Sequence, residues 1–273
     1  MNVDLHCHTT VSDGTLSPAQ LLDLAIEREI DMLAITDHDS IDSYRQIDTS
    51  KSPIKLVTGI ELSTTWQGRS VHIVGLNIDL TNQALLEGVN QQSLARDQRA
   101  VKISERLQAL GFANTLQGAR KISDGGQIGR PHFAQYLVQI NAVTSVQQAF
   151  NKYLGNGKAG DIKEHWASLE EVVAWIRNAG GVAVLAHPTK YKMTRTKLCL
   201  LLEDFIDAGG EAMEVISGSQ GPSITASMAG LCHKYNLLAS CGSDFHALEQ
   251  PWASLGHVAQ LPSNCHPVWT RWQ

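Results

Sequence analysis

The stretch Val3-Asp4-Leu5-His6-Cys7-His8, near the N-terminus, guides the interpretation of the whole sequence. Its first four residues are predicted to form a β-strand. Side chains alternate between the two faces of a strand, so His6 and His8 leave on the same face and Cys7 points the other way. This spacing presents two imidazoles to one metal ion. Alone the pair is weak evidence, because paired surface histidines show the same pattern.

Six further apolar runs are predicted to be strands, each followed by a polar or glycine-containing loop. They cover residues 32–36, 54–60, 71–76, 182–186, 212–216 and 237–241. Helices lie between many of these strands. Two begin at the capping patterns Ser17-Pro18-Ala19-Gln20 and Ser168-Leu169-Glu170-Glu171, and a third covers 197–208. Alternating strands and helices indicate a mostly parallel sheet, either barrel-like or doubly wound.

One connection between strands is too short for a crossover helix. The third and fourth strands are joined by Trp66-Gln67-Gly68-Arg69, which is typical of a hairpin turn. A turn centred near Gln67-Gly68 places Ser63 opposite His72, with Glu61 on the same face. Glu61 and His72 are then diagonal neighbours, close enough to share one ion.

The segment from about residue 82 to residue 160 breaks this alternation. Residues 84–110 are polar and helical, with only a narrow apolar stripe. We interpret the segment as a small helical insertion, or lid. The predicted organisation is therefore a barrel made of residues 1–81 and 161–273, with the insertion 82–160 between its two parts.

The residues that could carry chemistry lie at strand edges or in the loops that follow strands, where α/β folds build their sites. Six of the eleven histidines belong to this set. Scattered surface histidines would not sort in this way, so the pattern predicts a metal centre. The predicted ligands are His6, His8, Asp13, His38, Glu61, His72, His187, Asp244 and His246.

Nine nitrogen and oxygen ligands exceed the needs of one ion and suit two or three. Imidazole and carboxylate without thiolate favour manganese, iron or zinc over calcium, and we expect Mn²⁺. Neighbouring divalent ions generate a nucleophile near neutral pH and stabilise both oxygens of a phosphoryl transfer. Asp4, Asp37 and Asp39 lie beside ligands, and they either orient imidazole rings or are simple loop acids.

The composition excludes several classes of protein. The chain has 273 residues, of which 43% are hydrophobic and 18% charged, and this suits one sizeable core. No run approaches the roughly 18 apolar residues of a membrane span, and we expect no secretory signal. Five scattered cysteines are typical of free thiols in a reducing compartment, so we expect a cytoplasmic protein. A net charge of −5 predicts no surface for DNA or other long nucleic acid.

Five motifs resemble the polymerase and histidinol phosphatase (PHP) family across nearly the whole chain. They are Asp4-Leu5-His6-Cys7-His8-Thr9, Ile35-Thr36-Asp37-His38-Asp39, Thr58-Gly59-Ile60-Glu61, Ala186-His187-Pro188 and Gly242-Ser243-Asp244-Phe245-His246. The resemblance implies an α/β fold, a distorted (β/α)7 TIM-like barrel with a trinuclear metal site. The implied ligand sets are His6, His8, Glu61 and Asp244; Asp13, His38 and His246; and Glu61, His72 and His187.

Within that family, the insertion and the motif Ile128-Gly129-Arg130-Pro131-His132-Phe133 resemble the bacterial branch of 3′,5′-nucleoside bisphosphate phosphatases and ribonuclease AM. Arg130 offers a bidentate donor for a phosphate, and His132 offers a further donor. Arg195 is a candidate for a second phosphate contact. Instead of binding phosphate, Arg130 could be a surface arginine at a helix N-terminus, and Arg195 could be a solvated loop residue.

Two loops depart from that branch. A proline and an aromatic residue are expected after Gly157-Lys158, where this chain has Ala159-Gly160-Asp161. After Ala186-His187-Pro188, the sequence Gly-Arg-Tyr is expected, and Thr189-Lys190-Tyr191 stands in its place. These changes leave the predicted metal ligands untouched and leave the fine specificity open.

Together these features predict a metal-dependent phosphoesterase. Its substrates would be nucleoside 3′,5′-bisphosphates, which lose their 3′-phosphate, or short RNA, which loses nucleotides from its 5′ end as in a 5′-3′ exoribonuclease. We expect no obligate protein partner. A histidinol-phosphate-type phosphomonoesterase is the alternative within the same class. An amidohydrolase-like C–N hydrolase is less favoured, because its bridging carboxylated lysine has no obvious counterpart. A non-catalytic PHP module is less favoured because no ligand is missing.

Overall fold

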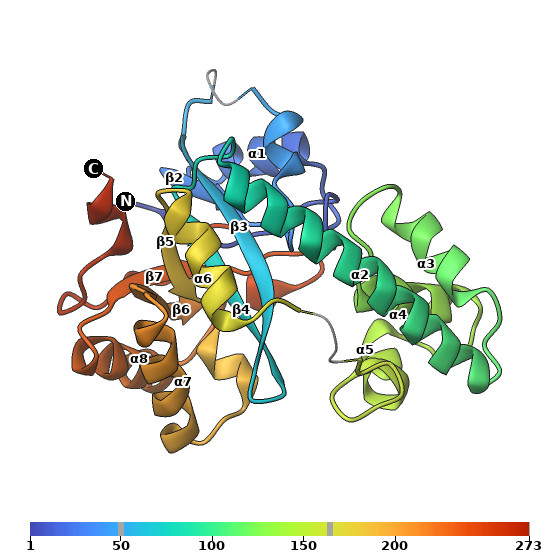
Figure 1. The fold of residues 1–273 in the computed structure, drawn as a ribbon. Helices are drawn as coiled ribbons and strands as arrows, with labels where there is room; N and C mark the ends of the chain where they lie inside the picture. The colour runs from blue at the N-terminus through green and yellow to red at the C-terminus, as the bar shows by residue number, and fades with distance from the viewer. Residues whose placement is uncertain (49–51, 163–165, 273) are drawn as a thin grey trace.

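Seven strands of the described residues form one sheet that curls into a nearly closed barrel (Figure 1). The structure is a computed structural model, and it describes residues 1–48, 52–162 and 166–272. The strands follow one another in space as they do in sequence. They are β1 (Val3–Asp4), β2 (Met32–Ile35), β3 (Lys55–Trp66), β4 (Arg69–Leu76), β5 (Val182–Leu185), β6 (Ala212–Ser217) and β7 (Leu238–Gly242). All seven overlap the strands predicted from the sequence, and the barrel-like alternative is confirmed.

The two ends of the sheet, β1 and β7, meet just beyond the strands themselves. The amide of Asp244 donates to the carbonyl of His6 at 2.8 Å, and the amide of His8 donates to the carbonyl of Phe245 at 2.9 Å. This ladder continues where β1 has already ended, so His6 and His8 lie past the strand and still have an extended, paired backbone. Barrel closure thereby places the first predicted ligand pair beside the last.

The hairpin of β3 and β4 is the exception to the parallel arrangement. β4 is antiparallel to both β3 and β5, whereas the other neighbouring strands pair in parallel. The turn residues Gln67 and Gly68 both have positive φ, 45° and 71°, as a type I′ turn requires. Ser63 lies opposite His72, as predicted, and Glu61 stands two residues along the same strand. The predicted hairpin is confirmed.

Four helices cover the outside of the barrel: α1 (Pro18–Glu27), α6 (Leu169–Asn178), α7 (Arg195–Asp207) and α8 (Pro222–Lys234) (Figure 1). The side chains of Ser17 and Ser168 accept the backbone bonds that start α1 and α6, so both predicted capping boxes are confirmed. α7 begins two residues before the predicted start, because Thr194 caps it. Among the described residues, no helix is both long and apolar enough to cross a membrane.

A second group of helices stands beside the barrel and is joined to it by the long helix α2 (Gln83–Ala109) (Figure 1). It contains α3 (Thr115–Ser123), α4 (Arg130–Gln139), α5 (Val146–Ala149) and a short π-helix (Phe150–Leu154). Its apolar side chains, Phe133 and Leu137 among them, form a hydrophobic cluster separate from that of the barrel. This arrangement agrees with a helical insertion, while the predicted boundaries at residues 82 and 160 stay a prediction.

Glycine determines how closely α2 approaches the barrel. A Cβ at Gly88 would lie 2.4 Å from the ring of Trp175 on α6, so a larger residue would push the two helices apart. The close contact anchors the first half of α2 on the barrel. Its middle turns are thereby held over the barrel mouth, where they contribute to the site described next.

Candidate metal centre

Glu61 lies at the centre of a buried cluster of histidines. Its Oε1 is 3.0 Å from Nδ1 of His72 and 2.9 Å from Nε2 of His187. Its Oε2 is 2.9 Å from Nδ1 of His38. Burial opposes ionisation of Glu61, yet the nearby imidazoles of His38, His6 and His72 hold the pKa of its carboxyl well below its usual range. Glu61 is therefore a buried carboxylate surrounded by imidazoles from several loops.

His6 and His8 approach the same carboxylate from the barrel seam. Their Nε2 atoms are 3.2 Å apart, and each lies 3.4 Å from Oε2 of Glu61. Oδ1 of Asp244 is 3.2 Å from Nε2 of His8 and 3.5 Å from Nε2 of His6. The other oxygen of Asp244 forms an ion pair with Lys190. Lys190 belongs to one of the two loops that depart from the family branch.

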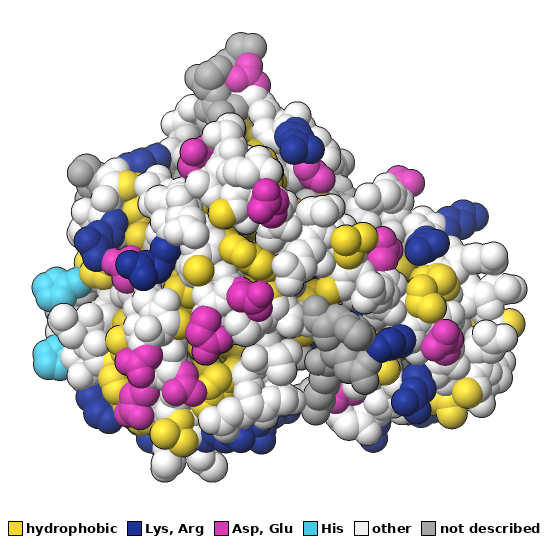
Figure 2. Space-filling view, in the orientation of Figure 1, with side chains coloured by type: hydrophobic (Ala, Val, Ile, Leu, Met, Phe, Trp, Pro, Cys, Tyr) yellow, Lys and Arg dark blue, Asp and Glu magenta, His cyan; other side chains and the backbone are white. Residues whose placement is uncertain are grey.

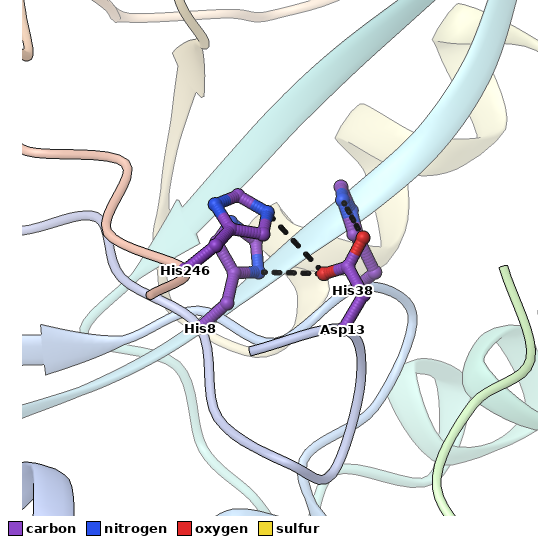
Figure 3. A group of neighbouring side chains, drawn as sticks. All are labelled: His8, Asp13, His38 and His246. Carbon is purple, nitrogen blue, oxygen red and sulfur yellow. Dashed lines mark ion pairs between the residues drawn. The ribbon is translucent and has the colours of Figure 1, made fainter. Parts of the chain in front are cut away.

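Asp13 faces three imidazoles that come from different loops (Figure 3). Its Oδ1 lies 3.3 Å from Nε2 of His246 and 3.9 Å from Nδ1 of His8. Its Oδ2 lies 3.8 Å from Nε2 of His38. With this group, all nine predicted ligands lie in one continuous cluster.

Several polar atoms of the cluster are buried and make no hydrogen bond within the described part of the chain. They are His8 Nδ1, Asp13 Oδ1, His38 Nδ1, Glu61 Oε2 and His187 Nδ1. Proteins rarely bury such atoms unpaired, because each costs about 1–3 kcal/mol of desolvation. Ligand atoms within 4.8 Å of one another form three overlapping groups: His8, Asp13, His38 and His246; His6, His8 and Glu61; and His38, Glu61 and His72. The donor set therefore fits divalent metal ions.

The backbone carries strain where it enters this cluster. His187 and Asp244 have φ values of 27° and 55°, and Asp39 beside His38 has a φ of 50°. A non-glycine residue in this region costs about 1–3 kcal/mol and persists only when the surroundings enforce it. Such positions concentrate at functional sites, which agrees with the location of the cluster.

Glu214 of β6 is a site residue that the sequence analysis missed. It is buried, its Oε1 lies 2.5 Å from Nδ1 of His6, and its Oε2 accepts from the amide of His187 at 2.7 Å. The first contact turns Nε2 of His6 toward Glu61. A carboxylate in the middle of the apolar run 212–216 was the available signal, because a buried charge needs a partner.

Asp4 and Asp37 accept hydrogen bonds from residues of the loops that carry predicted ligands. Asp37 accepts from the amide of Thr9 at 2.8 Å and from the hydroxyl of Ser12 at 2.6 Å. Asp4 accepts from the amide of Ser243 at 2.8 Å. These partners are backbone and hydroxyl groups, so the two carboxylates hold the ligand-bearing loops, and Glu214 is the residue that orients an imidazole ring.

Three arginines line a cleft beside the cluster. They are Arg96 and Arg99 of α2 and Arg130 at the start of α4, and the same cleft is lined by Asp13, His38 and His72. Arg96 forms an ion pair with Asp39 at 2.6 Å. The guanidinium groups of Arg96 and Arg99 each lie 5.3 Å from the ring centre of Trp166. We call this set of three side chains the arginine cleft.

Positive charge is crowded in the arginine cleft. Burial, with repulsion from Arg130 and Arg96, lowers the pKa of Arg99 to about 9. The guanidinium of Arg99 donates to the carbonyl of Ile162 at 2.9 Å, a neutral group. An anion would relieve both the repulsion and the desolvation. Arg96 and Arg99 were not predicted as site residues, although arginines three residues apart on a helix share one face.

The other two predicted substrate residues, His132 and Arg195, do not line the arginine cleft. The buried Nδ1 of His132 accepts from the amide of Gly129 at 2.9 Å. Arg195 is exposed at the start of α7 and donates to the hydroxyl of Ser227 on α8 at 2.7 Å. The geometry thus brings Arg130 to the cleft and gives Arg195 a contact with α8.

The chain is similar to a known domain family and to several known proteins. The model of the PHP domain family matches residues 4–183. The 5′-3′ exoribonuclease Rnm of Escherichia coli K12 is 40% identical, and the alignment covers 99% of this chain and 93% of that protein. The 3′,5′-nucleoside bisphosphate phosphatase of Chromobacterium violaceum is also 40% identical, with coverages of 98% and 95%. A solved structure described as an amidohydrolase from Chromobacterium violaceum, with bound sulfate and no metal, is 40% identical with a TM-score of 0.93, covering 99% of this chain and 95% of that one.

Proposed function

The chain belongs to the PHP domain family, as its motifs predicted, and from this premise we propose that it is a divalent-metal-dependent phosphoesterase acting on nucleotides. It removes the 3′-phosphate of nucleoside 3′,5′-bisphosphates and releases nucleotides from the 5′ end of short RNA. One observation carries the proposal. The arginine cleft shares Asp13, His38 and His72 with the histidine cluster, so a candidate anion site adjoins a candidate metal site.

We assign two or three divalent ions to the cluster, Mn²⁺ first and Fe²⁺ or Zn²⁺ as alternatives, held by the nine predicted ligands. When bound, such ions supply a nucleophile near neutral pH and a Lewis acid for the phosphoryl oxygens. Glu214 and Asp37 set the positions of imidazoles and loops before any ion arrives. The unpaired atoms of the cluster support this assignment.

Both proposed substrates require the same bond to be broken. In a 3′,5′-bisphosphate and in a 5′-phosphorylated RNA, a 5′-phosphate is followed by a nucleoside and then by the scissile phosphate. The arginine cleft would hold the 5′-phosphate, with Arg130 and Arg99 as charge-assisted donors. The phosphorus–O3′ bond then lies at the metal cluster. His132 and Arg195 remain candidate contacts for the phosphates.

The test is a comparison of substrates with a matched pair of variants. Wild-type protein loaded with manganese is expected to release phosphate from a nucleoside 3′,5′-bisphosphate and mononucleotides from 5′-phosphorylated RNA. Arg99→Gln removes a buried charged donor worth about 1.5–3 kcal/mol, so KM for the bisphosphate should rise about tenfold or more. A 3′-monophosphate without the 5′-phosphate should be affected little.

Arg106→Gln is the control, because Arg106 is exposed on the same helix. It should leave both substrates unaffected. Failure of the loaded wild type to release either phosphate or mononucleotides would contradict the proposal. A histidinol phosphate substrate belongs in the same screen, since a preference for it would favour the alternative within this class.

C–N hydrolysis is the second candidate, because one structural relative is described as an amidohydrolase. Ammonia release without phosphate release would favour it. Against it, a glutamate, Glu61, occupies the centre of the cluster, and Lys190 pairs with Asp244 at its edge. A non-catalytic module would bind fewer than two equivalents of metal and show no activity after loading.

We place this activity in the cytoplasm, with no obligate protein partner. The five cysteines are all free thiols, as expected in a reducing compartment. On the face shown in Figure 2, both basic and acidic side chains are present, and the basic ones form no continuous stripe. Such a mixed surface supports a short substrate held at the site over a long nucleic acid spread across the molecule.

A further inference from the structure

A cavity opens on the other side of the segment that begins α4. Its volume is ≈ 670 Å³, within the usual range for small-molecule sites. One wall comes from the barrel loops after β1 and β2. The other comes from α2, from the end of α3 and from the segment 124–128 that leads to α4. We call it the insertion cavity, because it lies between the barrel and the helical insertion.

The insertion cavity and the arginine cleft meet at the metal cluster. Asp13 and Arg130 line the cleft, whereas their neighbours Gly14 and His132 line the cavity. A Cβ at Gly14 would lie 2.4 Å from the carbonyl oxygen of His8, so glycine keeps this loop folded tightly over the cluster. A linear substrate that starts in the cleft and crosses the cluster can therefore continue into the cavity.

The charges of the two spaces are opposite. The arginine cleft has three guanidinium groups beside the carboxylate of Asp13. Among the residues that the structure describes, the ionisable groups lining the insertion cavity, His132 apart, are Asp42, Asp97, Asp124 and Arg120. Arg120 lies 3.6 Å from Asp97. Three acids and one arginine disfavour a phosphate. The cavity suits a neutral, polar part of the substrate.

Polar side chains and glycines make up most of the rest of the cavity lining, beside the apolar Val11, Ile122 and Ile128. Gly125 and Gly126 form part of it, as do Ser93 and Ser123. A Cβ at Gly126 would lie 2.4 Å from the carbonyl oxygen of Thr10, so glycine lets the insertion touch the barrel here. Such a lining matches the hydroxyls of a ribose and the edge of a base.

His132 adds an oriented donor. Its Nδ1 accepts from the amide of Gly129 at 2.9 Å, so the neutral ring carries its proton on Nε2. Burial lowers the pKa of this imidazole, which keeps the ring neutral at physiological pH. His132 thus combines a fixed tautomer with a place at the junction of cavity and cluster.

We propose that the insertion cavity binds the nucleoside that follows the scissile phosphate of a short RNA. This inference rests on the proposed function and extends it. The 5′-phosphate lies in the arginine cleft, the first phosphodiester lies at the cluster, and the second nucleoside enters the cavity. A nucleoside bisphosphate ends at the scissile phosphate and leaves the cavity unused.

The chemistry of the step follows from this placement. An oxygen of water forms a bond to phosphorus, the phosphorus–O3′ bond breaks, and the O3′ of the first nucleoside takes up a proton. The second nucleoside keeps the phosphate on its O5′. The shortened RNA therefore again carries the 5′-phosphate that the arginine cleft requires.

Two bulky substitutions on opposite walls test the inference. Ser93→Trp fills the cavity from α2, and Gln46→Trp fills it from the barrel side. For each, kcat/KM for a 5′-phosphorylated dinucleotide should fall at least tenfold, while kcat/KM for a nucleoside 3′,5′-bisphosphate should stay within twofold. Leu94→Trp is the control, because Leu94 is next to Ser93, is exposed and does not line the cavity.

Binding without turnover supplies an independent readout. Metal-free wild type should bind a 5′-phosphorylated dinucleotide more tightly than a nucleoside 5′-monophosphate, and both cavity variants should lose this difference. Full dinucleotide activity in both tryptophan variants would overturn the inference and leave the proposed function intact, as would an equal loss for the dinucleotide and the bisphosphate. If the wild type hydrolyses neither substrate, the proposed function fails and the inference fails with it.

Discussion

Replacing Glu214 by glutamine tests how the cluster is organised. Both oxygens of this carboxylate accept a hydrogen bond, Oε1 from Nδ1 of His6 and Oε2 from the amide of His187. Glutamine has one acceptor oxygen and one amide group, so it can satisfy only one of these donors. The backbone amide of His187 cannot change, and we expect it to keep the oxygen.

The NH₂ group of the new side chain then faces Nδ1 of His6, which must become an acceptor. The ring proton moves to Nε2, the atom that lies 3.4 Å from Glu61 and that we propose as the metal ligand. Loss of a partner that orients a metal-binding imidazole costs about tenfold to hundredfold in metal affinity. This corresponds to about 1.4–2.8 kcal/mol of binding free energy.

Titration calorimetry with Mn²⁺ measures the effect directly, with Glu211→Gln as the matched control. Glu211 lies three residues away and forms an ion pair with the exposed Arg271, so its loss should leave metal affinity unchanged. The reasoning is wrong if Glu214→Gln binds Mn²⁺ within twofold of the wild type. It is also wrong if Glu211→Gln weakens binding equally.

Three further predictions concern stability. Mn²⁺ at about one hundred times its Kd should stabilise the wild type by about 2.7 kcal/mol and raise its Tm. Glu61→Gln should not show this increase in Tm. An equal increase in both proteins would contradict a metal site centred on Glu61. In metal-free protein, burial opposes protonation of His246, but Asp13 raises the pKa of the imidazole from 6.5 to about 9. The pKa of His246 is higher in the folded state than in the unfolded state, so its protonation stabilises the fold. This stabilisation is complete below pH 6.5 and is lost as the pH rises through about 9. The free energy of unfolding, measured with denaturant across this pH range, should decline in the wild type and change less in His246→Asn. Gly126→Ala forces a Cβ against the carbonyl of Thr10 and should lower the free energy of unfolding by about 1–3 kcal/mol. The control Gly230→Ala, at an exposed and open position of α8, should raise it by about 0.5–1 kcal/mol. An unchanged free energy of unfolding in Gly126→Ala would show that the insertion can move away from the barrel.

Much of the fold could be predicted from local patterns. The seven strands and the capped starts of α1 and α6 depend on neighbours two to four residues apart, and such spacings are visible in any sequence. The hairpin is the clearest example. Gln67-Gly68 determines the turn, the turn determines the register, and the register brings Glu61 to His72.

The arginine cleft and Glu214 could not be assigned in the same way. Arg96 and Arg99 lie on a polar helix whose sequence does not show which protein surface it faces. Their position depends on α2 lying against α6, where Gly88 contacts Trp175, and on the insertion folding back beside Asp13. These contacts join residues far apart in the chain.

The sequence by itself determined which residues could bind metal and at which strand ends they stand, because alternation along a strand and the position of a loop are local properties. The tertiary structure decided which candidate ligands lie close enough to share an ion, through closure of the barrel between the His6 and Asp244 segments. It also decided that His8 and His38 each belong to two ligand groups, and that the arginine cleft, lined by Asp13, meets the insertion cavity, lined by Gly14. Distances across a packed core depend on how all the elements fit together, and no spacing within one element contains that information.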